Sequence, residues 1–234
     1  MGEPRTDQIE TALRAVLPAG VACAVIRPEI RPEGEAAGGD LAGAFSVEAE
    51  AMRAAVPKRR AEFFAGRAAA RRAMAQLGMP PAPVPMGDDR APVWPDGVVG
   101  SISHCEGVCV ALIARSETWR SLSVDVEPLE DLPRDLWDSV MGAQERARLA
   151  ELPEAARGRC GRLIFSAKEA VYKLQYPITA EWMEFSDLDV VVDAQEAGFD
   201  ARFCGRNVPE FARGGLRGQI LKLSGVMLCM MFLR

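Results

Sequence analysis

Two acidic residues, Asp125 and Glu127, end an apolar run in the sequence Leu-Ser-Val-Asp-Val-Glu. If this run is a strand, its two-residue alternation places both carboxylates on one face. Two hard oxygen ligands on one face can share a Mg²⁺ ion, which needs few protein carboxylates when water and phosphate oxygens complete its coordination. The alternative is a pair of exposed acids at a sheet edge. Leu122 and Val124 favour a strand buried on one side, where unpaired carboxylates are costly.

A second set of charged residues lies in the helical segment Leu163–Leu174. Apolar residues recur there at helical spacing and predict a buried stripe. Lys168, Glu169 and Lys173 lie off that stripe, and Glu169 and Lys173 share one face because they are four residues apart. One interpretation is a solvated face with a weak ion pair. The other is a metal ligand beside two cations that bind phosphate.

The only histidine, His104, follows Ser103 at the end of another predicted strand. A single histidine is usually a structural residue and does not form a Ser/His/Asp triad by itself. Together with Ser103 and nearby backbone N–H groups, it can instead donate hydrogen bonds to a phosphate. The predicted helix after Pro57 is strongly basic, with Glu62 as its one acid, although solvated basic faces are common.

The elements that must position these residues follow from periodicity and from Pro and Gly signals. The predicted helices cover residues 6–17, 57–78, 131–140, 144–152 and 157–176, the last ending at Pro177. The predicted strands cover residues 21–26, 98–103, 108–114, 122–126, 188–192, 199–204, 219–223 and 226–233. Loops are expected over 28–43 and 79–97, with a turn at 224–225. This order predicts an α+β protein with two α+β halves.

Composition narrows the class of protein. The 234 residues, 49% hydrophobic and 26% charged, suit one globular domain or two similar halves. A net charge of −5 argues against a nucleic-acid partner. The six cysteines form no CxxC pair or Cys/His cluster, so free thiols in a reducing cytosol are expected rather than zinc. Without a signal peptide or an apolar run of about 20 residues, we expect a soluble cytoplasmic monomer with no membrane partner.

Five segments, taken in chain order, resemble the motifs of the 4′-phosphopantetheinyl transferases, specifically the larger monomeric type related to the enterobactin-synthase transferase. They are Arg59–Arg67, Pro92–Pro95, Gly100–Cys105, Val124–Pro128 and Phe165–Lys173. Trp182 and Phe185 continue the pattern. Met86 stands where the family often has a basic residue, so either Arg90 substitutes for it or one phosphate contact is missing.

The resemblance implies two pseudo-twofold-related α+β halves, residues 1–114 and 115–234, with the site at their junction and the metal held by the second half. It also implies transfer of 4′-phosphopantetheine from coenzyme A to a carrier-protein serine, with release of adenosine 3′,5′-bisphosphate. The reaction would depend on Mg²⁺, with Mn²⁺ as the other candidate. The expected partners are acidic carrier domains of siderophore, polyketide, nonribosomal peptide or fatty-acid synthesis.

The resemblance further implies roles for the charged residues at the metal. Asp125, Glu127 and Glu169 would hold the metal against the coenzyme A pyrophosphate. Glu169 is the favoured general base, and Glu127 is the other candidate. Lys173 and Lys168 would neutralise the diphosphate.

Four further residues would clamp the 3′-phosphate and other phosphate oxygens: Arg59, Arg67, Ser103 and His104. Two other functions use the same side chains. A metal-dependent phosphohydrolase would use water as the nucleophile and act on a nucleotide diphosphate. A non-catalytic module would only bind coenzyme A or a carrier protein; Met86 keeps this alternative open, but neither alternative explains why all five motifs occur in order.

Overall fold

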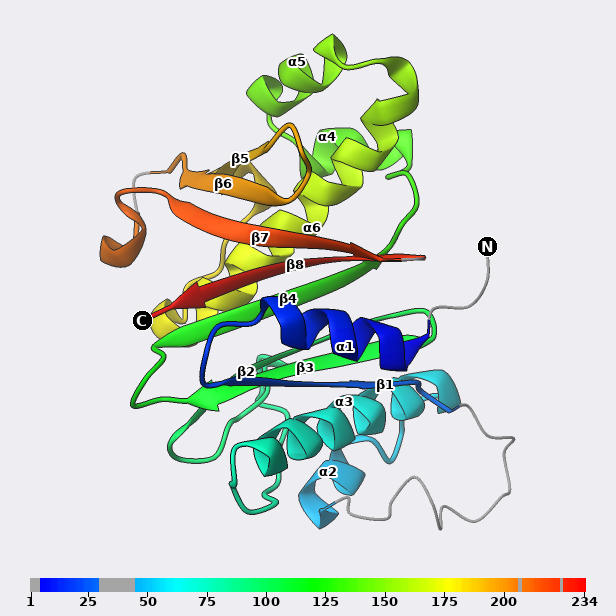
Figure 1. Cartoon of the computed structure of the whole chain (residues 1–234), viewed down its shortest axis with the longest axis vertical. Coiled ribbons are helices and arrows are strands. Elements are labelled where there is room, and N and C mark those ends of the chain that lie inside the picture. Colours follow the sequence, from blue (N-terminus) through cyan, green and yellow to red (C-terminus); the bar gives the residue numbers. More distant parts are fainter. Residues whose placement is uncertain (1–4, 30–44, 206–207, 224) are drawn as a thin grey trace. The chain divides into compact units, whose positions relative to one another are not determined.

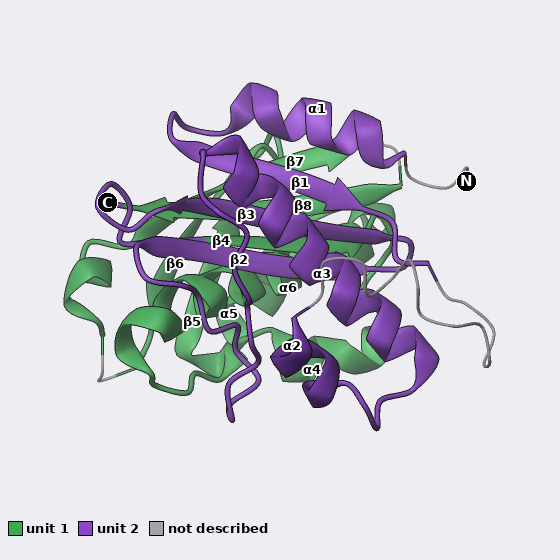
Figure 2. Cartoon of the chain, turned by 90° about the horizontal axis from the view of Figure 1, so that it is seen from below, with its two compact units in different colours: residues 1–2, 123–233 green, residues 3–122, 234 purple. Residues whose placement is uncertain are grey.

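A computed structural model of the protein describes residues 5–29, 45–205, 208–223 and 225–234. The protein divides into two compact units (Figure 2). The N-terminal unit contains residues 3–122 and 234, and the C-terminal unit contains residues 1–2 and 123–233. Both contain helices and antiparallel strands, which confirms the predicted α+β class. Residues 30–43 of the predicted 28–43 loop, and Ser224 of the predicted turn, lie outside the described residues.

The N-terminal unit is built from three helices and three strands in its described part. These are α1 (Thr6–Val16), β1 (Val21–Ile26), α2 (Ser46–Ala51), α3 (Pro57–Gln76), β2 (Val98–Cys105) and β3 (Val108–Arg115). The strands form an antiparallel sheet in the order β1-β3-β2. The sequence did not predict α2.

Helix α3 packs against this sheet through small residues. Ala69, Ala70 and Ala73 are fully buried and contact a cluster that includes side chains of β1 and β3. Small side chains let the helix backbone approach the sheet closely. Trp94 packs on the same cluster, as predicted, and Gly100 leaves the space for its ring, because a Cβ there would lie 2.8 Å from the indole.

The C-terminal unit begins within β4 (Ser121–Pro128), which starts in the N-terminal unit. The remaining elements are η1 (Arg134–Leu136), α4 (Trp137–Val140), α5 (Ala143–Glu151), α6 (Glu154–Thr179), η2 (Phe185–Asp187), β5 (Leu188–Val192), β6 (Gly198–Phe203), η3 (Glu210–Ala212), β7 (Leu216–Leu223) and β8 (Val226–Leu233). The sheet order is β4-β8-β7-β6-β5.

Helix α6 crosses one face of this five-stranded sheet and contacts β8, β5 and β6 (Figure 1). Its apolar stripe, including Ala167, Val171 and Leu174, is buried as predicted. The predicted end at Pro177 is wrong, because α6 continues to Thr179 and ends at Ala180 in the left-handed conformation. A proline in the last turn removes one helical hydrogen bond and leaves the rest of the helix intact.

Strand β4 differs from the expectation of burial on one side. Its residues from Ser121 to Val126 are all buried, so both faces are covered. Asp125 therefore lies in an interior environment where a carboxylate needs partners.

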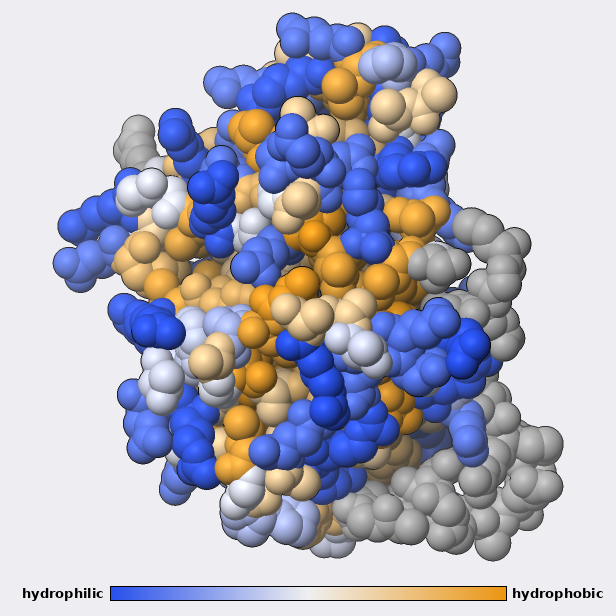
Figure 3. Space-filling view, in the orientation of Figure 1, coloured by the Kyte–Doolittle hydropathy of each residue, from blue (hydrophilic) through white to orange (hydrophobic). Residues whose placement is uncertain are grey.

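Figure 3 shows hydrophilic and hydrophobic residues mixed over the face seen in Figure 1. No helix in the described part of the chain is both long and apolar enough to cross a membrane.

Candidate functional site

Four polar residues of α6 follow one another at spacings of four, three and four, which places them on one side of a helix with 3.6 residues per turn. We call them the acid-facing stripe: Arg162, Ser166, Glu169 and Lys173. Three of these side chains contact or neutralise the acids at the end of β4. Alternation along β4 places Asp125 and Glu127 on the same face, as predicted.

Asp125 lies at the centre of this arrangement. It is 3% exposed, and each of its carboxylate oxygens accepts a hydrogen bond from α6. The ammonium of Lys173 donates to Oδ1 at 2.6 Å, and the hydroxyl of Ser166 donates to Oδ2 at 2.8 Å. A buried carboxylate is stable in such a place because a cation and a donor compensate for its lost hydration.

Glu127 pairs with the first residue of the acid-facing stripe. Arg162 Nη1 donates to Glu127 Oε2 at 2.9 Å, and both side chains are largely buried. Burial, together with the negative charge of Asp125, raises the pKa of Glu127 to about 7, against the opposing charges of Arg162 and Lys173. The ionised form of Glu127 is therefore disfavoured mainly by burial and secondarily by the nearby Asp125.

Glu169 shares this electrostatic neighbourhood. Burial raises its pKa, the charge of Asp125 acts in the same direction, and Lys173 opposes both. Asp125 thus influences both glutamates. The described residues nevertheless contain no group of three His, Cys, Asp or Glu side chains arranged to hold a metal ion. The three predicted ligands are neighbours, but they are not a preformed three-ligand cage.

Lys168 does not belong to this site, which corrects two expectations. Its side chain is fully buried rather than off the buried face, and its ammonium donates to Val140 O, Glu145 Oε2 and Phe185 O at 2.7–2.9 Å. An ammonium has three N–H donors, so these three acceptors use them all. The predicted contact of Lys168 with a diphosphate does not fit this geometry.

In the N-terminal unit, Arg59 and His104 lie together. Arg59 Nη1 is 3.3 Å from His104 Nε2, and because arginine only donates, this ring nitrogen accepts. The proton of a neutral ring is then on Nδ1, which lies 3.9 Å from Glu62 Oε2. A guanidinium beside a partly exposed imidazole can bind a phosphate group. Ser103 is 6% exposed and lies on the opposite face of β2 from His104, so the two predicted donors do not share a face.

Arg67 is buried within the N-terminal unit rather than part of an open basic face. Its Nε donates to Val84 O at 3.0 Å, and its guanidinium lies 3.8 Å from the centre of the Phe63 ring. Burial lowers the pKa of Arg67 to about 10, although the charge of Glu48 opposes this effect. Arg71 is held by the fully buried Glu48 at 2.7 Å. These contacts favour a structural role for Arg67 over the predicted phosphate clamp.

Met86, the departure from the expected basic position, forms a bridge with Pro92 and packs against the cluster of Met52, Phe63 and Phe64. The candidate substitute Arg90 is exposed and has a φ of 69°. Met86 is therefore a packing residue.

Several functional partners were missed from the sequence. Arg162 and Ser166 had a usable signal, because their spacing continues that of Glu169 and Lys173 along α6. No sequence pattern indicated Glu48 or Glu145, since each is buried by contacts with residues remote in the chain.

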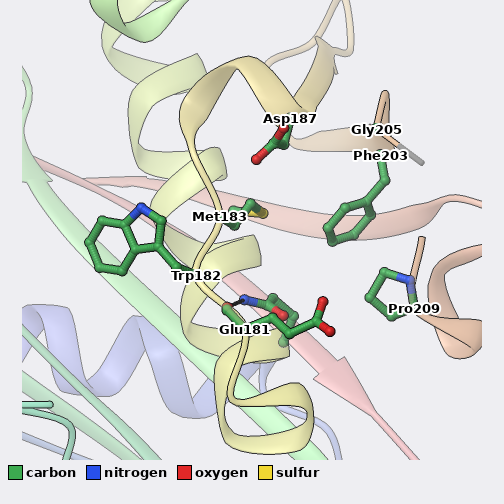
Figure 4. A pocket seen from close by; sticks show the side chains of 8 residues that line it. Glu181, Trp182, Met183, Asp187, Phe203, Gly205 and Pro209 are labelled. Atoms are coloured by element: carbon green, nitrogen blue, oxygen red, sulfur yellow. Dashed lines mark hydrogen bonds between the residues drawn. The ribbon is translucent and has the colours of Figure 1, made fainter. Parts of the chain in front are cut away.

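A pocket of about 190 Å³ lies in the C-terminal unit beside the last turns of α6 (Figure 4). Its lining includes Glu181, Met183, Asp187 and Phe203, and it contains none of the predicted catalytic or metal residues. Figure 4 shows the Trp182 indole turned away from Phe203. Trp182 is 79% exposed.

Two family models match this chain, one in its N-terminal part and one in its C-terminal part. The family model described as the 4′-phosphopantetheinyl transferase N-terminal domain matches residues 47–114. The model of the 4′-phosphopantetheinyl transferase superfamily matches residues 121–215, which contain the acids of β4 and all of α6.

Individual relatives agree with these matches. The 4′-phosphopantetheinyl transferase Npt of Nocardia iowensis is 37% identical over 189 residues, 81% of this chain and 80% of that protein. PptT of Mycobacterium tuberculosis is 40% identical over 159 residues, 68% of this chain and 70% of that protein. Enterobactin synthase component D of Salmonella typhimurium is 40% identical over 128 residues, 52% of this chain and 50% of that protein.

Proposed function

Since this chain belongs to the 4′-phosphopantetheinyl transferase family, we propose that it draws the transferred group from coenzyme A, with Mg²⁺ held at the acids of β4 and α6. The enzyme transfers 4′-phosphopantetheine to carrier proteins. The observation that carries the proposal is the pairing of buried Asp125 with Lys173 and Ser166, beside two glutamates whose pKa values are raised.

The reaction is a phosphoryl-type transfer. The hydroxyl oxygen of the carrier serine attacks the β-phosphorus of coenzyme A and forms the new phosphodiester bond. The bond from this phosphorus to the bridging oxygen breaks, and adenosine 3′,5′-bisphosphate leaves with that oxygen. The serine proton passes to Glu169, directly or through water, with Glu127 as the other candidate base. Such a transfer needs positioning and charge neutralisation more than covalent catalysis.

The donor set of the site fits magnesium. Asp125, Glu127 and Glu169 supply hard carboxylate oxygens, and the pKa values of both glutamates are raised by burial and by the charge of Asp125. A divalent cation offsets that repulsion. Asp125 and Glu127 would hold the ion together with water and substrate phosphate oxygens, and Glu169 would complete the set. When bound, Mg²⁺ polarises the phosphoryl group and stabilises the leaving phosphate.

The cations have separate tasks in this proposal. Lys173 is 25% exposed, so its ammonium can exchange part of its contact with Asp125 for a diphosphate oxygen. In the N-terminal unit, Arg59 and His104 bind a phosphate of coenzyme A, which is consistent with their 3.3 Å contact.

The partner is an acidic carrier-protein domain, and the enzyme acts as a monomer. Exposed Lys58 and Arg59 at the start of α3 provide positive charge on an otherwise acidic chain, which favours encounter with an acidic partner. The enterobactin synthase relatives make siderophore carriers the first class to test.

The test is to incubate the purified chain with coenzyme A, MgCl₂ and a panel of apo carrier proteins, and to weigh the products. We expect one carrier class to gain the mass of a single phosphopantetheine group. A carrier with its acceptor serine replaced by alanine must gain none, and EDTA must stop the reaction. Modification of the carrier that persists in EDTA would mean that the transfer does not require a metal ion.

The same experiment separates the alternatives. A phosphohydrolase would release adenosine 3′,5′-bisphosphate in the absence of any carrier. A binding module would retain coenzyme A without modifying any carrier.

A further inference from the structure

The Lys168 ammonium is the centre of a buried network that lies apart from the acids of β4. Its side chain is 0% exposed, and its three acceptors belong to three different segments. Val140 is at the end of α4, Glu145 is in the first turn of α5, and Phe185 begins η2. One side chain of α6 thus binds three segments that are separate in the sequence.

Glu145 extends the network to a fourth segment. Its Oε1 accepts the backbone N–H of Val190 in β5 at 2.8 Å. Its Oε2 accepts the N–H of Gly142 at 2.8 Å in addition to the Lys168 ammonium at 2.7 Å. Glu145 is 1% exposed. Both charges are therefore compensated entirely by each other and by backbone groups, which is the condition for burying an ion pair.

The network determines how α6 can be rotated and shifted. Lys168 precedes Glu169 and is displaced from it by roughly 100° around a helix of 3.6 residues per turn. Three hydrogen bonds on that side fix both the rotation and the axial position of the helix. The acid-facing stripe on the other side meets Asp125 and Glu127 only in one such position, because Lys173 and Ser166 reach opposite oxygens of the same carboxylate.

We infer that Lys168 is a positioning residue for the transfer: it acts through Glu169 by holding α6 against its neighbours, and it does not contact coenzyme A. The inference rests on the proposed role of Glu169. A group of this kind affects the rate of the chemical step, since small displacements of reacting groups are costly, while leaving the binding of the phosphates nearly unchanged.

The experiment compares K168M and E145Q with K222M in the full-length enzyme. K168M keeps the side-chain length and removes the charge, whereas E145Q keeps the shape and removes the partner's charge. K222M is the matched control, because Lys222 of β7 pairs with Glu196 at a partly exposed site and not with Lys168 or Glu145. For each variant, kcat and the KM for coenzyme A are measured well below its melting temperature, and amide hydrogen exchange is followed over residues 160–176.

We expect K168M and E145Q each to lower kcat by about tenfold to a hundredfold, with the KM for coenzyme A within about twofold of the wild type. Exchange in α6 should rise in both variants, and K222M should behave as the wild type does. A large rise in KM for K168M alone, with E145Q unaffected, would mean that Lys168 contacts phosphate and would overturn the inference. Lower melting temperatures with unchanged kcat would mean that the network has a purely structural role, and this result would also overturn the inference.

If K168M does not fold, E145Q carries the test alone, because it preserves Lys168 and the volume of the site. If the wild-type enzyme modifies no carrier, the proposed function fails. The exchange measurement then still decides the inference: unchanged protection of α6 in both variants would refute the anchoring by Lys168.

Discussion

The two sides of α6 carry two lysine–carboxylate pairs that differ in what surrounds them. Lys168 and Glu145 are 0% and 1% exposed, and backbone groups of neighbouring segments complete their hydrogen bonds. Lys173 and Asp125 form an equally short contact, but the lysine is 25% exposed. The first pair is closed to solvent. The second remains accessible to an incoming anion.

The Lys168–Glu145 pair therefore fixes the position of α6, whereas the Lys173–Asp125 pair can rearrange. Breaking a closed pair leaves a buried charge with no partner, which is strongly destabilising. An accessible pair can exchange one contact for a phosphate oxygen at modest cost, because water and ligand reach it. Sequence motif alone does not distinguish the two lysines, since both lie in one short segment.

The largest effect is expected where the closed pair is broken. K168M should lower the free energy of unfolding by about 3–5 kcal/mol, because Glu145 becomes an unpaired buried carboxylate. Urea denaturation followed by circular dichroism measures the change. K222M should change it by less than about 1 kcal/mol, as for a partly exposed pair. Equal losses in the two variants would contradict the distinction between the closed Lys168–Glu145 pair and a partly exposed surface pair.

Breaking the accessible pair should affect catalysis more than folding. D125N should lower kcat by about 10²–10³, because the site loses the charge that fixes Lys173 and that the proposed metal binds. The carrier's mass gain over time measures the rate. D138N removes an exposed carboxylate paired with Arg146 and serves as the control. Wild-type turnover by D125N would exclude Asp125 from the site.

Removing the cation of the accessible pair should weaken binding and also lower stability, because the buried Asp125 carboxylate loses its ammonium partner. K173M should raise the KM for coenzyme A by about tenfold to a hundredfold, since a hydrogen bond between a charged donor and a phosphate is worth about 1.5–3 kcal/mol. Steady-state kinetics at several coenzyme A concentrations checks this value. An unchanged KM would mean that Lys173 serves only to hold Asp125.

The smallest effects are expected at two glycines of α6 that have different neighbours. A Cβ at Gly158 would lie 2.5 Å from Asp131, whereas a Cβ at Gly161 would be 3.5 Å from Leu132, an ordinary contact. G158A should destabilise by about 1–3 kcal/mol through overpacking. G161A should be neutral or stabilising by up to about 1 kcal/mol, because alanine favours the helix. Thermal unfolding of the two variants measures the difference, and the opposite order would contradict the packing of residues 131–132 on α6.

Local patterns were enough to predict the main elements of the site. Alternation placed Asp125 and Glu127 on one face of β4, and helical spacing placed Glu169 and Lys173 on one side of α6. Motif order identified the family. The alternation in β4 and the spacing in α6 depend on residues close together in the chain, so backbone periodicity determines them.

The environment of each charge was decided only by the tertiary structure. Lys168 and Arg67 resemble exposed cations in the sequence, yet Lys168 meets Glu145 and Arg67 meets Val84 from distant segments. Helix α2 and its buried Glu48 were missed for the same reason, since Glu48 is held by Arg71 and Val84. A charged side chain can be buried only where remote acceptors converge on it, and that convergence is a property of the packed chain rather than of any short segment.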